Sequence, residues 1–255
     1  VDTDAAAIFK IATIQEIGIG YSREVYSHEN GKIYAGGQLN RYDVGLLKSY
    51  VGLQNSSNVD RLLKDQLDAS RETESGFGVD VGVIWVADNY RLGATINDIN
   101  APSFKYTNST DDCSVFNDYV DINESNNNVT SATLADCNKN DSYVIDSQLK
   151  LRAVTSAWNE KLTIGLGYDA NAVKDPFGQK YQWLTLGAGI NLGNWAAMRA
   201  GYRANQATNG LKFITFGFTI LSFNVDLGVS SEKAQIDGES VPRSMYASLS
   251  WGLNF

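Results

Sequence analysis

Apolar side chains occupy every second position in segment after segment of this chain. In 160–170, for example, one parity holds Leu162, Ile164, Leu166 and Tyr168, and the other holds glycine, threonine and charged residues. Successive side chains of a β-strand point to opposite faces, so this period predicts strands with one apolar and one polar face. Eleven segments show it: 12–22, 32–46, 77–86, 90–98, 143–155, 160–170, 183–192, 196–203, 212–220, 223–231 and 244–255.

The length of these segments favours a membrane protein. They have roughly 9–13 residues, which suits a tilted strand that crosses a bilayer and exceeds the usual strand of a soluble sheet. The mean hydropathy of −0.24 is no obstacle, because alternation hides the apolar residues in the average. We therefore expect an all-β fold, an antiparallel up-and-down transmembrane β-barrel that forms one domain over 1–255. Because bacterial barrels have even strand numbers, we expect 12–14 strands in the parent protein, about 11 of them here, with N-terminal strand(s) lacking.

The connections between predicted strands alternate between short and long, as periplasmic turns and external loops do. The turns at 87–89, 157–159, 193–195 and 221–222 are then periplasmic. Residues 58–73 predict a short amphipathic helix in an external loop, and the opening 1–11 also fits a helix. Aromatic residues fall near both predicted rims, as in the girdles of membrane barrels: Tyr21, Trp85 and Trp251 on the periplasmic side, Tyr168 and Tyr202 on the external side.

The external loop at 107–142 is strongly acidic and contains both cysteines of the chain, Cys113 and Cys137. Two cysteines in one polar loop favour a disulfide over two free thiols, and a disulfide implies an oxidising compartment. No C-x-x-C spacing suggests thiol–disulfide catalysis. The formal net charge of −8, concentrated in this loop, argues against nucleic-acid binding.

Charged residues on the polar parity are the best functional candidates, because they would point into the barrel lumen. Two interpretations stay open: they line an aqueous pore and set its selectivity, or they form ion pairs that fill the barrel. With His28 as its one histidine, the chain offers no catalytic triad or histidine metal site, so we expect no enzyme, metal or cofactor. The candidates are Asp80, Arg91, Asp146, Lys150, Arg152, Lys161, Arg199 and Arg203.

Several segments resemble a known family. F-G-V-D-V-G-V-I-W at 77–85 and N-Y-R-L-G-A-T-I-N-D-I-N-A-P-S-F-K-Y at 89–106 are similar to the conjugal-transfer TraF-type outer-membrane β-barrel family. I-Q-E-I-G-I-G-Y-S-R-E-V at 14–25 and Y-A-G-G-Q-L-N-R-Y at 34–42 are similar too. The resemblance implies a barrel distantly like the long-chain fatty-acid transporters, and a further N-terminal part. A final strand that contains Trp251 and ends in Phe255 resembles the signal read by the barrel-assembly machinery.

Two functional hypotheses follow. The first is a channel or transporter for small or hydrophobic solutes in the outer membrane of a Gram-negative bacterium. The second is a non-transporting structural or surface component of an envelope or conjugation assembly. In both, the expected partners are membrane lipid, the barrel-assembly machinery and other envelope proteins.

Overall fold

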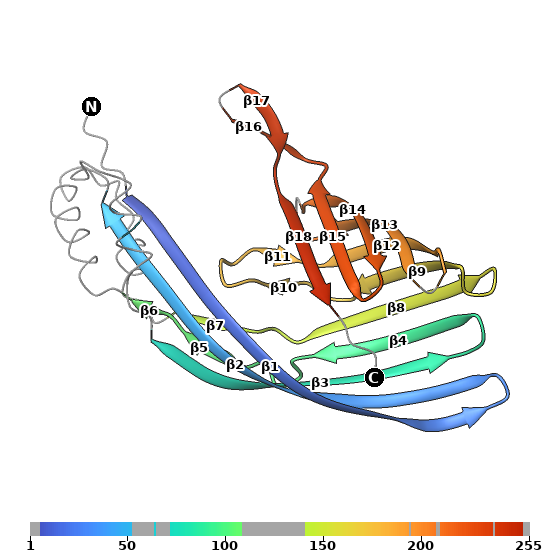
Figure 1. Cartoon of the computed structure of the whole chain (residues 1–255). Coiled ribbons are helices and arrows are strands. Elements are labelled where there is room, and N and C mark those ends of the chain that lie inside the picture. Colours follow the sequence, from blue (N-terminus) through green and yellow to red (C-terminus); the bar gives the residue numbers. More distant parts are fainter. Residues whose placement is uncertain are drawn as a thin grey trace. The chain divides into compact units, whose positions relative to one another are not determined.

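The protein is an all-β, antiparallel structure in the part of the chain that the computed structural model describes, residues 6–52, 64, 72–108, 141–193, 195–207, 210–236 and 238–251 (Figure 1). One sheet follows the order β1–β2–β3–β4–β8–β9–β12–β13–β14–β15–β18. Its strands are β1 (Ala6–His28), β2 (Gly31–Gly52), β3 (Thr73–Val86), β4 (Tyr90–Asn97), β8 (Gln148–Ala157), β9 (Leu162–Asp169), β12 (Trp183–Asn191), β13 (Ala196–Asn205), β14 (Lys212–Ile220), β15 (Phe223–Ser230) and β18 (Met245–Trp251).

Short strands occupy the long connections. The pairs are β5 (Ser103–Lys105) with β7 (Ser142–Val144), β10 (Val173–Lys174) with β11 (Lys180–Tyr181), and β16 (Lys233–Ile236) with β17 (Glu239–Pro242). A further strand, β6 (Thr107–Asn108), pairs with β2 in parallel. No helix in the described ranges is long and apolar enough to cross a membrane.

The eleven strands of the main path correspond one for one to the eleven predicted segments, which confirms the antiparallel all-β prediction. Within the helix predicted over 58–73, Lys64 is helical and Thr73 already belongs to β3. Two local predictions were wrong. The opening is extended from Ala6 onward and is not helical. The predicted strand at 143–155 is interrupted, since 145–147 separate β7 from β8. Most of 58–73 and 109–140, including Cys113 and Cys137, lies outside the described residues.

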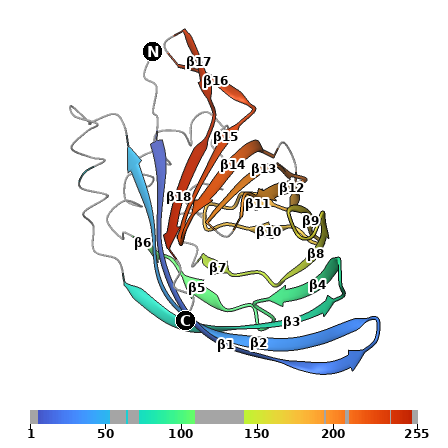
Figure 2. The same ribbon diagram turned by 45° about the vertical axis from the view of Figure 1, so that its right-hand side comes forward.

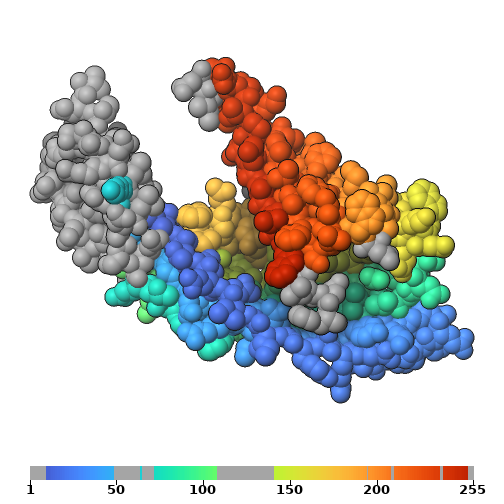
Figure 3. Space-filling model, viewed as in Figure 1, coloured from blue at the N-terminus to red at the C-terminus, as the bar shows by residue number. Residues whose placement is uncertain are grey.

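Cross-strand pairing keeps apolar residues beside apolar residues. Leu186 of β12 lies opposite Leu166 of β9 and Tyr202 of β13, and Phe216 of β14 lies opposite Leu227 of β15. These side chains are exposed, Phe216 to 62%. Neighbouring strands β14, β15 and β18 form one continuous surface in Figure 3, and Figures 1 and 2 both show them side by side. The sheet therefore has one apolar outward face and one polar inward face.

The chain divides into two compact units. Unit 1 comprises Val1–Gly18, Asn40–Gly78 and Ala101–Ile145, and unit 2 comprises Ile19–Leu39, Val79–Asn100 and Asp146–Phe255. Strands β1, of 23 residues, and β2, of 22, contribute to both units. Both are longer than predicted and about twice as long as a strand needs to be to cross a bilayer.

Unit 1 has a small hydrophobic core of Tyr42, Val44, Leu46 and Phe104. Leu46 and Leu47 are adjacent and point to opposite faces of β2, yet both are buried. This stretch of β2 is therefore covered on both sides. The ring of Phe104 packs so closely on Gly76 that a Cβ there would lie 2.7 Å from it, so β3 requires glycine at this position.

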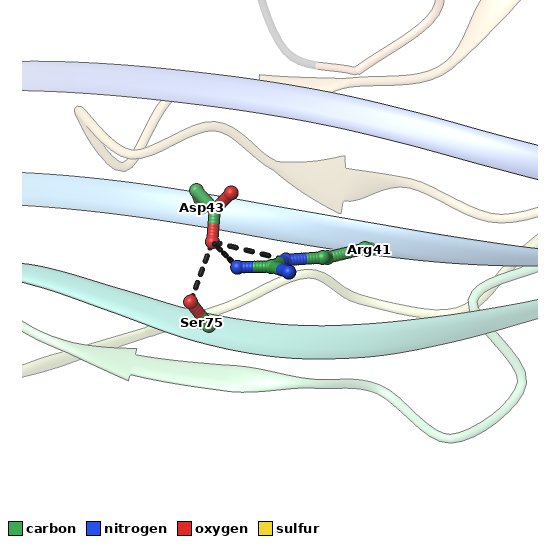
Figure 4. Close-up of polar contacts among 3 residues, drawn as sticks. All are labelled: Arg41, Asp43 and Ser75. Carbon is green, nitrogen blue, oxygen red and sulfur yellow. Dashed lines mark hydrogen bonds and ion pairs between the residues drawn. The ribbon is translucent and has the colours of Figure 1, made fainter.

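A polar cluster links β2 to β3 within unit 1 (Figure 4). The Ser75 hydroxyl donates a hydrogen bond to Asp43 Oδ1, and Arg41 Nη2 lies 3.2 Å from the same oxygen. The hydrogen bond from Ser75, supported by the Arg41 charge, lowers the pKa of the Asp43 carboxyl. Deeper in the unit, the ammonium of Lys48, nearly inaccessible to solvent, lies 2.6 Å from Asp141 Oδ2.

The core of unit 1 predicts a local loss of stability in Phe104→Ala. Removing a fully buried phenylalanine costs roughly 3–5 kcal/mol, because apolar contact is lost and a cavity is left. Amide hydrogen exchange of β5 and β7 should therefore accelerate strongly. Phe177→Ala is the matched control, because Phe177 is half exposed and belongs to unit 2. Unchanged exchange in Phe104→Ala would show that this core does not hold β5 and β7 together.

Candidate functional site

A cavity of about 390 Å³ lies on the polar face of unit 2. Its walls include Arg152 of β8, Arg203 of β13 and Tyr246 of β18. Strands β8 and β18 are six places apart in the sheet order, so a flat sheet would separate them by roughly 29 Å. Their side chains line one cavity because the sheet of unit 2 curls toward its polar face, as Figure 2 shows for the strands from β8 to β18.

The strand register sets two arginines on one row of this face. Arg152 lies opposite Gly167, Gly167 opposite Thr185, and Thr185 opposite Arg203. The two residues between the arginines are small, and the Arg152 guanidinium reaches over Gly167, where an added Cβ would lie 3.7 Å from Arg152 Nη1. The row thus forms a shallow cleft with a cationic side chain at each end.

Aromatic residues form a second wall. The Arg203 guanidinium lies 3.8 Å from the ring centroid of Trp183, which is a close cation–π contact. Phe213 lies 6.1 Å from Trp183 and 5.6 Å from Tyr246, centroid to centroid. This chain of ring contacts fixes the orientation of Arg203, because its planar group is stacked on one side.

The cavity has one carboxylate, Asp169, which lies opposite Lys150 in the register. Asp169 is buried, and its Oδ2 accepts hydrogen bonds from the Trp183 backbone N–H at 3.0 Å and from Gln148 Nε2 at 3.3 Å. These donors satisfy the carboxylate locally. Nearby, burial and then the charge of Asp175 raise the pKa of the Tyr181 hydroxyl, so it stays protonated at neutral pH.

A larger cavity of about 730 Å³ adjoins the first, since Tyr181 and Trp183 line both. It adds the cations Lys180 and Arg243 and the carboxylate of Asp175. Positive side chains therefore outnumber negative ones in both cavities, although the chain as a whole carries a net charge of −8. Such an arrangement attracts and holds anionic groups.

Of the eight predicted lumen residues, the structure brings Lys150, Arg152 and Arg203 into the cavity. Arg199 shares their face but is paired, with Nη2 3.0 Å from Asp226 Oδ1 and Nη1 2.9 Å from Thr219 Oγ1. On this face, therefore, three of the predicted residues line a cavity and a fourth forms an ion pair.

The other four predicted residues lie elsewhere. Lys161 belongs to the turn before β9 and is exposed. Asp146 precedes β8 and accepts a hydrogen bond from the Lys174 backbone N–H at 3.2 Å. Asp80 accepts one from the Asp98 backbone N–H at 2.8 Å, and Arg91 is exposed near the β3–β4 turn. Lys161 and Asp146 lie outside the strands because β9 and β8 begin later than the alternation predicted.

Trp183, Tyr181 and Tyr246 are cavity residues that the sequence interpretation did not select. The signal for two of them was present in the alternation. Trp183 and Tyr246 fall on the polar parity of β12 and β18, and a large aromatic residue there must fill space on the inward face. Tyr181 lies in the β10–β11 hairpin, which has no alternation to place it.

The fold and the cavity define a class: an all-β, antiparallel protein that, in unit 2, has an exposed apolar face and a cavity with more cationic than anionic side chains. Comparison of the sequence with protein families is more specific. The profile of the family described as the F plasmid transfer operon TraF protein matches residues 2–172, so the chain belongs to that family. The match ends before β12, and Trp183, Arg203 and Tyr246 lie beyond it. No curated protein and no solved structure matches the chain.

The packing of Tyr246 on its cross-strand neighbour Gly228 predicts that the effects of substitutions at these two positions on stability are coupled. A Cβ on Gly228 would lie 2.1 Å from the Tyr246 ring, so Gly228→Ala should push the ring out of place. We expect a loss of about 1–3 kcal/mol from overpacking, measured by thermal or denaturant unfolding. In a Tyr246→Ala background the same change should cost almost nothing.

Gly187→Ala is the control for that pair, because its Cβ would meet nothing closer than the Ala200 backbone oxygen at 3.7 Å. If Gly228→Ala lowered the free energy of unfolding equally in the presence and absence of the Tyr246 ring, the proposed contact would be contradicted.

Proposed function

We propose that this protein is an outer-membrane β-barrel component of an envelope assembly that serves conjugation, with the sheet of unit 2 crossing the bilayer. Its role in this proposal is structural or surface-exposed and not catalytic. The observation that carries the membrane part is the exposed apolar face of the sheet. Membership of the TraF family supports the conjugative part.

The outward face is unlike that of a soluble sheet. Large apolar side chains on adjacent strands stand exposed in register, including Met198, Phe216 and Leu249 at 60%, 62% and 74%. Contiguous apolar patches of this extent mark an interface with a membrane or a partner. The β9, β12, β13, β14, β15 and β18 strands have 7–10 residues, close to what a tilted spanning strand needs.

The connections support an orientation. Turns such as Leu221–Ser222 are short, whereas the opposite ends of the strands carry the β10–β11 and β16–β17 hairpins. In outer-membrane barrels the short turns face the periplasm. Unit 1 differs from the spanning sheet, because Leu46 and Leu47 on opposite faces of β2 are both buried within the protein.

Barrel closure belongs to the same proposal. Open sheet edges do not occur in the hydrocarbon region, so a spanning sheet must have every strand paired. The main path has β1 and β18 at its two ends, and the described residues contain no pairing between them. A closed barrel of 12–14 strands, assembled by the barrel-assembly machinery, would satisfy both edges.

The apolar face predicts opposite outcomes for adjacent positions of β14. Phe216→Arg places a charge on the lipid-facing side, at a cost of about 2–4 kcal/mol near the bilayer centre, and should abolish outer-membrane assembly. Thr215→Arg, one residue away on the inward face, should assemble. Fractionation of donor-cell membranes and the frequency of plasmid transfer are the measurements.

The two readouts separate the two parts of the proposal. Normal assembly of Phe216→Arg would contradict the membrane-spanning sheet. Unimpaired plasmid transfer from donors that lack the protein would contradict the conjugative role and leave the membrane assignment intact.

The cationic cavity favours a second candidate function, a channel for small solutes. Cationic rings in a lumen select anions. Reconstituted protein in a planar bilayer should then conduct chloride in preference to potassium, and Arg152→Glu together with Arg203→Glu should reverse that preference. A complete lack of conductance would remove this second candidate and favour the structural role.

A further inference from the structure

The cationic cleft between β8 and β13 has the features of a ligand site. Arg152 and Arg203 come from strands three places apart in the sheet, lie on one row of the register and line the same cavity. Within the described ranges, neither arginine forms an ion pair with a carboxylate. Arg199 on the same face differs from them, because it forms an ion pair with Asp226. Three cationic side chains, Lys150, Arg152 and Arg203, share this cavity with one carboxylate, Asp169, so an anion between the two guanidinium groups would be stabilised.

The floor of the cleft leaves room for that anion. Gly167 has no side chain, and Thr185 offers a hydroxyl that can donate a further hydrogen bond. The carboxylate of Asp169 accepts hydrogen bonds from Trp183 N and Gln148 Nε2, and within the described residues it forms no ion pair with either arginine. An anionic group with two or more oxygens fits the planar donors of arginine.

The surroundings indicate an organic ligand and not a bare inorganic ion. Tyr181 and Tyr246 line the cavity beside the arginines, and its volume of about 390 Å³ is that of a small-molecule site. A phosphate or chloride ion would fill a small part of this space. The aromatic rings offer an apolar or planar body a surface to pack against.

We infer that this cavity binds a small organic anion, with its carboxylate or phosphate group between Arg152 and Arg203 over Gly167 and Thr185. The body of the ligand packs against the rings of Tyr181 and Tyr246. This inference depends only on the cavity, and it holds whether or not the protein forms a channel for solutes. Arg152 lies inside the segment that matches the family profile, and Arg203 lies beyond it.

Titration calorimetry of the full chain in a non-ionic detergent tests the inference, with benzoate as the probe. Benzoate should bind, and Arg152→Gln should weaken its binding about ten- to hundredfold, the effect of losing a charge-assisted hydrogen bond. Arg91→Gln is the matched control, because Arg91 is exposed and lies outside the cavity. The affinity of this variant for benzoate should be unchanged. Benzylammonium, of the same size but opposite charge, should not bind.

Further variants separate binding from folding. Arg203→Gln should also weaken benzoate binding, but this change removes the cation–π contact with Trp183 as well as the charge. Arg203→Lys keeps the positive charge without the planar guanidinium group, so it should weaken benzoate binding less. Binding of benzylammonium as tight as that of benzoate, or equal affinity in Arg152→Gln and Arg91→Gln, would overturn the anion site. Inorganic phosphate bound as tightly as benzoate would overturn the assignment of an organic body.

Discussion

The backbone hydrogen-bond ladder of the main sheet is the constraint on which the rest of the structure depends. It fixes which side chains share a face, because a slip of one residue would exchange the two faces of a strand. In the observed register Leu166, Leu186 and Tyr202 lie on one row outward, while Gly167, Thr185 and Arg203 lie on the neighbouring row inward. The exposed apolar face and the cationic cavity are therefore two results of a single register.

The same strands follow a different rule where they enter unit 1. There β2 buries adjacent residues, Leu46 and Leu47, so the separation into an apolar and a polar face ends. The core around Phe104 and the ion pair of Lys48 with Asp141 replace the alternating pattern. Long strands that change their surroundings along their length connect two environments without any loop between them.

Alternation made the strands of unit 2 predictable, because each buried or exposed position repeats at a fixed spacing. It placed Lys150, Arg152 and Arg203 on the inward face correctly. The alternation could not locate the ends of strands, because a turn residue such as Lys161 keeps the parity of the strand that follows it. It also gave no sign that the opening D-A-A-A-I-F-K continues into β1. The opening has good helix formers, but pairing along 22 residues of β2 outweighs that weak local preference. The cavity itself depends on the curl of the sheet, which brings β18 toward β8 and leaves no trace in the spacing of residues.

Gly228 beneath Tyr246 and Gly217, where a Cβ would lie 2.1 Å from Asp226 Oδ1, have a consequence for how this sequence can diverge. At these two inward positions the tolerated substitutions are limited by volume, since added atoms collide with an ion pair or a ring. On the outward face they are limited by polarity, and Leu, Ile, Phe and Met can replace one another. Selection along each strand therefore switches at every residue between two different criteria, and drift can alter the outer surface extensively while the interior keeps its shape.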